Sequence, residues 1–501
     1  MSHSSETATQ EPFKLWKNLL GQPSKSSFYS PNLMKGILAI CIFSALPLLY
    51  FSANFHGLIS RTASCPECSP AFRRQVIHEV VNSGRHDNHQ RTNTSHILFG
   101  IGGSAASWGQ RRHYCELWWR PHMHRVFVWL DQKPGDGAPE PWPDTSPPYK
   151  VSEDTSRFKY NCGDASRSAV RIARIVKESF ELGLKDVRWF VMGDDDTVFF
   201  TENLVNVLSK YDHNEMYYIG CHSESVEQVL THSYSMGYGG GGFAISYPLA
   251  AELVRILDGC IDRYADFYGS DEKISGCMSE IGVPLTKELG FHQMDIQGNP
   301  YGLLSAHPLA PLVSLHHLDN IQPLFPDITR IDSVKKLIKA YESDPSRALQ
   351  HTFCYDMSRN WSVSVSWGYT VQLFPFLVTG KVLSIPLRTF STWRTLSPEP
   401  FTFDTRVMSS DPCERPVVFY FDGVKDVRNQ KTLTWYKRVI DPNKGMRCER
   451  EDYTAAYLVK GFNVLAANLD PQVWNKAPRR QRCELMNGSD RQDGVLHVKI
   501  I

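Results

Sequence analysis

Three consecutive aspartates, Asp194, Asp195 and Asp196, stand between two apolar runs in the stretch RWFVMGDDDTVFF. Such flanks place the charges at the edge of a hydrophobic core rather than on an exposed loop. Carboxylates held close together have raised pKa values unless a cation neutralises them. A hard divalent ion such as Mn²⁺ or Mg²⁺ does this, and it can hold a diphosphate on its remaining positions. The triplet therefore favours a metal site over the alternative of a solvated turn.

A glycine-rich stretch, YGGGGFAIS, follows at residues 238–246. Four glycines, Gly240 and Gly241 among them, form a backbone without Cβ atoms to block the close approach of a ligand. A Walker loop requires Lys-Ser/Thr after the glycines, and this sequence has Phe243 and Ala244 there. The stretch is interpreted as part of a binding site, with a flexible turn as the alternative.

Two later stretches carry groups suited to acid–base or metal chemistry. In YGSDEKISGCM, Asp271 and Glu272 fit the N-terminus of a helix, and one of them also fits the role of a general base beside a sugar site. In LVSLHHLD, an apolar strand ends at His316 and His317. Either histidine is a candidate nitrogen ligand for a metal held by the aspartates.

Alternating strands and helices must position these groups. The stretches 96–103, 124–131 and 187–196 are predicted strands, and 168–182 has apolar residues at helical spacing. This alternation predicts an α/β domain with a mostly parallel sheet covered by helices on both faces. Ligands bind at the carboxyl ends of the strands in such sheets, and the three aspartates stand at such an end.

The pattern changes from about residue 321. In WSVSVSWGYTVQL, residues 361–373, large apolar residues alternate with small or polar ones. This period predicts a half-buried antiparallel strand or hairpin. With a further strand at RPVVFYFDGV, it predicts a β-rich C-terminal region at 321–501.

The N-terminal part predicts a membrane anchor. Residues 36–53 contain no charged side chain, and the uncharged flank extends to residue 59, so 36–59 suits a bilayer span better than a signal peptide. Three N-glycosylation sequons, at Asn93, Asn360 and Asn487, and eleven of the twelve cysteines follow it. We therefore expect a cytosolic tail at 1–35, a stem at 60–92 and a lumenal remainder.

The net charge and the number of cysteines limit the kinds of partner that the sequence favours. The chain has 54 basic and 53 acidic side chains, which argues against a nucleic-acid binder driven by bulk charge. An odd number of lumenal cysteines leaves at least one free or paired between chains, so a disulfide-linked homodimer is compatible with the sequence.

The order of these signals resembles the Fringe-like branch of the β-1,3-glycosyltransferases over roughly residues 93–320. The whole chain resembles plant Fringe-like proteins of formerly unknown function, including the block GSDEKISGCMSEIGVPLTKELGFHQMD and the tail APRRQRCE. The resemblance implies a GT-A fold, an α/β sheet whose carboxylates hold Mn²⁺ or Mg²⁺ on a UDP-sugar.

The resemblance also implies roles for individual residues. It implies Asp194 and Asp196 as metal ligands with His316 or His317, and Asp195 near the ribose or the metal shell. It implies Asp271 or Glu272 as the base, although Glu272 stands where the family has a second aspartate. It implies a donor- and acceptor-binding set made of Arg111, Trp119, Gly240 and Gly241, and a disulfide between Cys260 and Cys277.

The implied activity is an inverting, Mn²⁺-dependent transfer of a hexose or N-acetylhexosamine from a UDP-sugar to a glycan or glycoside, forming a β-1,3 linkage. The implied setting is a type II Golgi membrane protein with a lumenal catalytic domain. One alternative is a catalytically inactive Golgi glycan-binding or scaffold protein that stacks sugars on Trp361 and Trp367. Another is a metal-dependent hydrolase of nucleotide sugars, which differs only in using water as the acceptor.

Overall fold

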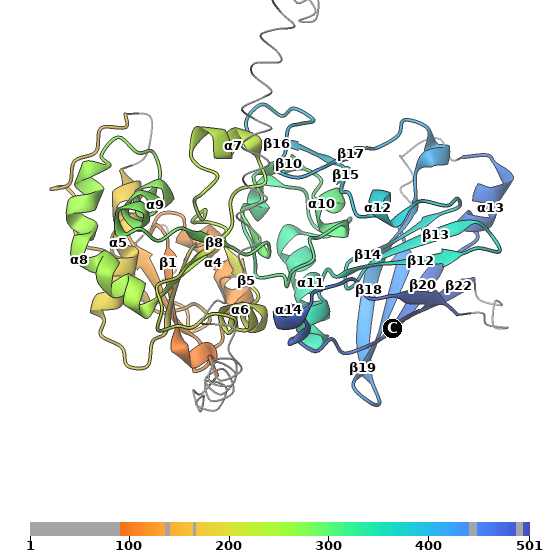
Figure 1. The fold of residues 1–501 in the computed structure, drawn as a ribbon, viewed down its shortest axis with the longest axis horizontal. Coiled ribbons are helices and arrows are strands. Elements are labelled where there is room, and N and C mark those ends of the chain that lie inside the picture. Colours follow the sequence, from red (N-terminus) through yellow and green to blue (C-terminus); the bar gives the residue numbers. More distant parts are fainter. Residues whose placement is uncertain (1–90, 136–140, 164–166, 440–447, 487–493) are drawn as a thin grey trace, which may run out of the picture. The chain divides into compact units, whose positions relative to one another are not determined.

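The computed structural model describes residues 91–135, 141–163, 167–439, 448–486 and 494–501. The predicted tail (1–35), the anchor (36–59) and the stem up to residue 90 lie outside these residues. No helix in the described part is both long and apolar enough to span a bilayer. Residues 91–501 belong to one structural unit (Figure 1).

A seven-stranded sheet forms the N-terminal part of this unit. Its strands are, in spatial order, β3 (Tyr149–Val151), β2 (Arg125–Leu130), β1 (Ile97–Gly102), β4 (Trp189–Asp194), β7 (Phe243–Ser246), β6 (Tyr218–Gly220) and β8 (Leu285–Lys287). Four of the six neighbouring pairs are parallel, and β7 runs antiparallel to both of its neighbours. The predicted mixed α/β fold with a mostly parallel sheet is therefore confirmed.

Helices cover both faces of this sheet, as predicted. They are α4 (Trp108–Trp118) and α6 (Thr201–Leu208) on one face, and α5 (Ser168–Glu181), α8 (Tyr247–Arg263) and α9 (Ser270–Ile281) on the other. Successive strand residues point to opposite faces. Accordingly, Phe99 of β1 packs with α4, whereas the adjacent Leu98 packs with α5 and α8.

A small sheet gathers three chain segments that are distant in sequence. It contains β5 (Val198–Phe199), β11 (Ser314–Leu315) and β9 (Phe291–His292), with β11 in the middle. β11 runs antiparallel to β5 and parallel to β9. Because β5 follows the aspartate triplet and β11 precedes His316, this pairing brings the triplet and the histidine pair together.

The predicted β-rich region contains an eight-stranded sheet. Its strands are, in order, β12 (His351–Asp356), β13 (Trp361–Ser366), β14 (Thr370–Phe374), β18 (Val417–Val427), β19 (Lys431–Arg438), β20 (Gly461–Ala467), β22 (Val495–Ile500) and β21 (Cys483–Leu485). All neighbouring pairs are antiparallel except β20 with β22.

The β13–β14 hairpin confirms the antiparallel prediction but corrects its burial. Every residue of both strands is buried, so the hairpin is not half-exposed. Its polar face packs against protein and has hydrogen-bond partners there. Ser366 donates to Leu304 O at 3.1 Å, and Gln372 donates to the Tyr301 hydroxyl at 2.9 Å. Small hydrogen-bonded side chains can face a protein interior as readily as water.

The two tryptophans of this hairpin region cannot form a glycan platform. Trp361 is 5% exposed and Trp367 is fully buried, both within the core. The interpretation of these rings as a sugar-stacking surface is therefore wrong. Their alternation with serines reflects core packing.

Helix α11 (Arg330–Ser343) lies between the two large sheets (Figure 1). Leu337 and Ala340 are buried in a core that also holds Phe99 of β1 and Phe419 of β18. The Tyr341 hydroxyl accepts a hydrogen bond from the amide of Glu202 in α6 at 2.9 Å. One hydrophobic core thus extends across residue 320.

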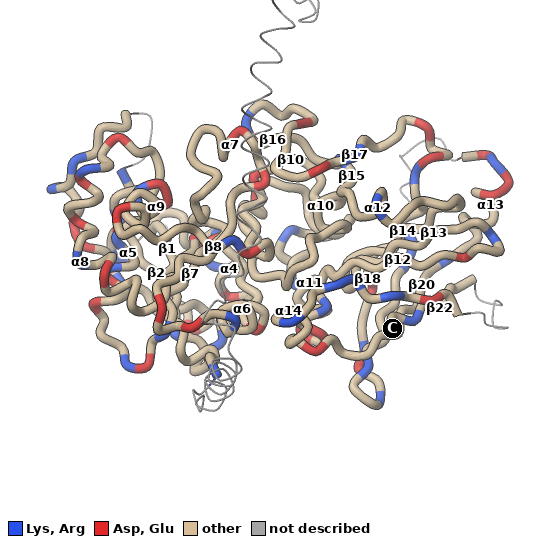
Figure 2. The backbone as a smooth tube through the Cα atoms, viewed as in Figure 1, with Lys and Arg blue, Asp and Glu red and all other residues tan. Residues whose placement is uncertain are grey.

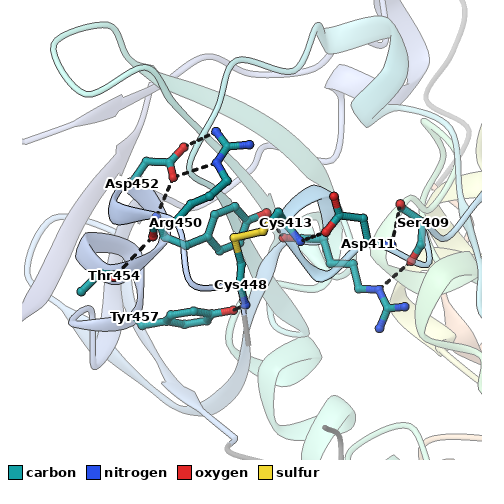
Figure 3. The surroundings of a disulfide bond; sticks show 10 residues. Ser409, Asp411, Cys413, Cys448, Arg450, Asp452, Thr454 and Tyr457 are labelled. Carbon is teal, nitrogen blue, oxygen red and sulfur yellow. Dashed lines mark hydrogen bonds and ion pairs between the residues drawn. A yellow bond between two sulfur atoms is a disulfide. The ribbon is translucent and has the colours of Figure 1, made fainter. Parts of the chain in front are cut away.

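Three disulfides lie within the described residues. Cys260–Cys277 joins α8 to α9, as the resemblance implies. Cys354–Cys483 joins β12 to β21, and Cys413–Cys448 ties the 3-10 turn Pro412–Glu414 to the segment before α13 (Glu451–Tyr457) (Figure 3). The described cysteines outside disulfides are Cys115, Cys162 and Cys221.

Charged residues of both signs are interspersed along the described backbone (Figure 2). This distribution agrees with the near-neutral total of the sequence.

Close packing of α10 (Tyr301–Ser305) against β15 (Leu387–Arg388) leads to a stability prediction. A Cβ on Gly302 would overlap the carbonyl oxygen of Leu387. We expect Gly302→Ala to destabilise the protein by about 1–3 kcal/mol, because backbone must move to admit the methyl group. Gly259→Ala in α8 is the control, since its Cβ would meet only the flexible Arg263 side chain. Urea unfolding of both variants checks this, and equal midpoints would contradict it.

Candidate active site

The aspartate triplet occupies a tight turn at the end of β4. The amide of Thr197 donates to Asp194 O at 3.0 Å, and the Thr197 hydroxyl accepts from the Asp194 amide at 2.9 Å. The same hydroxyl donates to Gly240 O at 2.7 Å. The turn is therefore fixed to the glycine-rich segment, and its three carboxylates face three different surroundings.

Asp196 and Asp194 face His316. The His316 Nε2 atom lies 3.0 Å from Asp196 Oδ1 and 3.6 Å from Asp194 Oδ2. One ligand atom from each of these three residues can be chosen so that all lie within 4.8 Å of one another. The other ring nitrogen, Nδ1, lies 3.3 Å from Gln293 O, which orients the ring so that Nε2 faces the carboxylates.

Asp195 faces α4 instead. The Arg111 guanidinium lies 3.0 Å from Asp195 Oδ1 and 3.6 Å from Asp196 Oδ2. The Ser107 hydroxyl donates to Asp195 Oδ2 at 3.4 Å. Arg111 therefore balances part of the negative charge from the side of the turn opposite to His316.

Burial and mutual repulsion shift the pKa values of this cluster. Burial and the neighbouring carboxylates raise the pKa of Asp194 to about 7 and that of Asp195 to about 6, although His316 and Arg111 oppose these shifts. Burial also acts to raise the pKa of Asp196, but His316 and Arg111 outweigh it and hold that pKa well below its usual range. Burial lowers the pKa of His316, but Asp196 and Asp194 outweigh it and raise it to about 9.

These residues fit a hard divalent cation. Both carboxylate oxygens of Asp196 are buried, and neither accepts a well-formed hydrogen bond within the described residues. Buried carboxylate oxygens of this kind are normally satisfied by hydrogen bonds or by a metal. Two carboxylates and one imidazole suit Mn²⁺ or Mg²⁺.

The second histidine has a different setting. His317 Nδ1 lies 2.9 Å from Asp295 Oδ1, and its ring stacks on Trp393 at 4.5 Å between centroids. His317 is not part of the cluster of Asp194, Asp196 and His316. Of the two histidines that the sequence left open, the geometry brings His316 to the carboxylates.

The glycine-rich segment makes room for His316. A Cβ on Gly240 would overlap the His316 ring, so only glycine fits there. The amide of Gly241 donates to Gln293 Oε1 at 2.6 Å, and the Ser314 hydroxyl donates to Gly241 O. These contacts join the glycine-rich segment before β7 to β11 and to Gln293, which follows β9. The close packing of this segment against the site explains why glycine is required at position 240.

A cavity of about 250 Å³ opens beside the cluster. The groups that line it include Asp194, His316 and His317 of the candidate metal site, the candidate base Asp271, and Gly239 and Gly240. The amide of Gly239 donates to Asp271 Oδ2 at 3.1 Å. Burial raises the pKa of Asp271, and this hydrogen bond only partly opposes the shift.

Glu272 points away from this cavity. Its Oε2 accepts hydrogen bonds from the amides of Tyr268 at 2.6 Å and Gly269 at 3.1 Å, and its Oε1 lies 2.6 Å from His232 Nδ1. Burial acts to raise the Glu272 pKa, but these bonds outweigh it and lower the pKa. The geometry thus assigns Glu272 to the N-terminal cap of α9 and leaves Asp271 facing the cavity.

Several predicted site residues are not among the residues that line this cavity: Arg111, Trp119, Asp195, Asp196, Gly241 and Glu272. Trp119 follows α4 and packs, half-buried, against the core. Sequence reasoning missed Gln293, Asp295 and His232. The first two are, with His292, the polar residues of the stretch GFHQMDI, and polar residues between Phe291 and Ile296 were a signal that could have identified them. His232 had no comparable signal.

Comparison with known families identifies the chain. The profile of a family described as "Protein of unknown function, DUF604" matches residues 228–483, just over half of the chain. The chain belongs to the DUF604 family. The matched segment includes the glycine-rich stretch, Asp271 and His316 as well as most of the β-rich region.

This DUF604 protein is also similar to proteins named beta-1,3-glucosyltransferase. Those of Homo sapiens and Mus musculus are 32% identical to it over 137 and 139 residues. The matches cover 27% and 28% of this chain, but only 26% and 27% of the relatives, so the chain matches about a quarter of their length.

A solved structure of a glycosyltransferase involved in the glycosylation of the major capsid of PBCV-1 is a further match. It aligns with 47% of this chain and 96% of its own, at 13% sequence identity and a TM-score of 0.25.

The charge balance around His316 yields a prediction for the metal-free protein. In EDTA, we expect His316 to titrate near pH 9 and Asp196→Asn to lower its pKa by about 1 to 3 pH units, because a nearby carboxylate favours the imidazolium. An unfolded imidazole titrates near 6.5, so this pairing stabilises the fold below about pH 6.5 and is lost as the pH rises through about 9.

Histidine NMR titration of the metal-free protein measures this shift. Glu342→Gln on α11 is the control, because Glu342 is exposed and pairs with Arg120 far from the cluster. An unchanged His316 pKa in Asp196→Asn would show that Asp196 does not hold the imidazolium.

Proposed function

We propose that this DUF604 protein is a glycosyltransferase of the Fringe-like type. It transfers a hexose or N-acetylhexosamine from a UDP-sugar to a glycan or glycoside acceptor, with inversion, Mn²⁺ dependence and a β-1,3 linkage. The observation that carries the proposal is that Asp194 and His316 of the Asp194–Asp196–His316 cluster line the same cavity as Asp271. The similarity to proteins named beta-1,3-glucosyltransferase supports it.

Two sets of residues at this cavity suit the two chemical tasks of such a transfer, which are stabilising the leaving diphosphate and activating the acceptor hydroxyl. Asp194, Asp196 and His316 would hold the metal, whose positive charge neutralises the departing diphosphate. Arg111 contacts both Asp195 and Asp196 next to this group, and its partly exposed guanidinium suits contact with the nucleotide. A sugar donor bound there places its anomeric carbon in the cavity, toward Asp271.

Asp271 supplies the base. Its carboxylate takes the proton from the acceptor hydroxyl while that oxygen forms a bond to the anomeric carbon, and the bond from this carbon to the UDP oxygen breaks. The raised pKa of Asp271 suits a proton acceptor that works near neutral pH. A single displacement of this kind inverts the anomeric configuration.

The proposed setting is the Golgi lumen, with the chain anchored by residues 36–59 in a type II orientation. Support comes from the three disulfides, which form in oxidising compartments. The sequon asparagines Asn93 and Asn360 are both exposed, as glycosylation requires.

The first test is nucleotide-sugar binding to the full-length protein by calorimetry, with Mn²⁺ and with EDTA. We expect UDP-sugar binding that depends on Mn²⁺, and a loss of roughly 10- to 100-fold or more in metal affinity for Asp196→Asn, because a buried ligand is removed. Absence of UDP-sugar binding with Mn²⁺ would overturn the proposed function. Release of free sugar without transfer to any acceptor would favour the hydrolase instead.

Two adjacent glycines provide a matched pair for this experiment. Gly240→Ala displaces the His316 ring and is expected to weaken Mn²⁺ binding, whereas Gly239→Ala brings its Cβ only to 3.7 Å from Asp271 and is expected to preserve it. Equal Mn²⁺ affinities in the two variants would show that His316 is not a ligand of the metal.

A second prediction concerns the base. Asp271→Asn is expected to reduce transfer by about 10²- to 10⁴-fold while leaving the Kd of the UDP-sugar nearly unchanged, since a general base acts on the acceptor. Glu272→Gln is the control, because glutamine preserves the cap of α9. Single-turnover transfer with radiolabelled donor measures both. A larger loss in Glu272→Gln than in Asp271→Asn would reverse the assignment.

A further inference from the structure

A turn of the β-rich region lies over the candidate active site. Residues 392–397, here called the rim turn, follow β16 (Phe390–Thr392) and contact α7 (Val226–Thr231), which lies near β16 in Figure 1. The amide of Arg394 donates to Glu227 Oε2 at 2.8 Å. The amide of Thr392 donates to Ser397 O at 2.8 Å, which closes the turn. The rim turn therefore has a defined conformation.

Trp393 is the aromatic group of this turn. Its ring is nearly parallel to that of His317, with an interplanar angle of 9°. His317 lines the cavity and is fixed from behind by Asp295, which also accepts a hydrogen bond from the Ser223 hydroxyl at 2.6 Å. Trp393 is half-buried, so it adds a partly accessible aromatic surface next to a residue of the cavity wall.

Arg394 is the cation of this turn, and its side chain contacts His232, another residue that lines the cavity. The guanidinium lies 3.5 Å from His232 Nε2, and His232 in turn contacts Glu272, the neighbour of Asp271. Arg394 is exposed, and within the described residues no ion pair joins it to a carboxylate. Its charge is therefore available to a ligand.

The charges of the residues that line the cavity indicate which kind of sugar would need a cation at its entrance. Asp194 and Asp271 line the cavity, and no lysine or arginine is among its lining residues. A neutral sugar needs no extra cation there. A sugar with a carboxylate would be repelled by Asp271 unless a positive group stood at the entrance, and a guanidinium binds a carboxylate through two parallel hydrogen bonds.

We propose that the rim turn is an acceptor subsite that selects a uronic acid, an acceptor saccharide whose terminal ring carries a carboxylate. This proposal rests on the proposed transferase function. Trp393 packs against the C–H face of the pyranose, and Arg394 pairs with its carboxylate. Arg394 contacts His232, which lines the cavity together with the candidate base Asp271, and this contact assigns the subsite to the acceptor and not to the nucleotide.

The test measures binding of two matched probes, methyl β-glucuronide and methyl β-glucoside, to the full-length protein. Saturation-transfer NMR in the presence of UDP, with Mg²⁺ in place of paramagnetic Mn²⁺, suits weak ligands. We expect the glucuronide to bind roughly tenfold or more tightly than the glucoside, as one charge-assisted hydrogen-bond pair allows. Sodium acetate should not displace it, because acetate lacks the ring that packs on Trp393.

Variants separate the two contacts. Arg394→Gln is expected to abolish the preference for the glucuronide, Arg394→Lys to retain part of it, and Trp393→Leu to weaken both probes. Lys335→Gln on α11 is the control, because Lys335 is exposed and pairs with Asp332. Partial retention in Arg394→Lys distinguishes loss of charge from a misfolded turn.

The same samples are titrated with UDP and with UDP-glucuronate. UDP binding without any preference for the methyl glucuronide, or a preference that survives Arg394→Gln, would overturn the subsite alone. Weaker UDP-glucuronate binding in Arg394→Gln with unchanged acceptor binding would move the rim turn to the donor and overturn the acceptor assignment. Absence of UDP binding would overturn the proposed function, and the subsite with it.

Discussion

The burial of three adjacent carboxylates is the constraint on which the site depends. Side by side and largely out of water, they would repel one another and become protonated. The protein resolves this by turning the chain sharply after β4, so that Asp196 meets His316, Asp195 meets Arg111 and Asp194 opens to the cavity. Two of the three charges thus face a cationic side chain, and the remaining negative charge creates a place for a metal cation.

That compensation requires segments far apart in the chain. Arg111 comes from α4, His316 follows β11, and the orienting carbonyl belongs to Gln293 after β9. The small β5–β11–β9 sheet holds the last two beside the aspartate turn. Gly240 must lack a side chain because His316 occupies the space where one would lie. The geometry of the site therefore depends on how these segments pack together as well as on the identity of the ligand residues.

The β-rich region is structurally continuous with this arrangement. α11 carries the core from the first sheet to β18, and the rim turn stacks Trp393 on His317. Its buried hairpin uses serine hydroxyls to satisfy backbone carbonyls of the neighbouring helix. The region thus contributes a wall near the cavity, whereas its tryptophans Trp361 and Trp367 contribute to the core.

The sequence by itself determined those features that depend on local pattern. The apolar residue pattern predicted the strands β1, β2 and β4 and the helix α5. The apolar residues on both sides of the aspartate triplet predicted its position at the end of a strand. These inferences succeed because side-chain period and strand ends are properties of neighbouring residues. The grouping of Asp194, Asp196 and a histidine came instead from the resemblance to the Fringe-like family.

The tertiary structure alone decided which of two adjacent candidates faces the site. His316 rather than His317 meets the carboxylates, and Asp271 rather than Glu272 faces the cavity. The side chains of two adjacent residues point in different directions, and their hydrogen-bond partners determine which one faces the site. Asp295 binds His317, and the backbone amides that Glu272 caps hold Glu272 at the start of α9. The burial of the polar face of the β13–β14 hairpin likewise depends on the segments that pack against it. The contact of Arg394 with His232 depends on the position of α7. Neither can be predicted from a local sequence pattern.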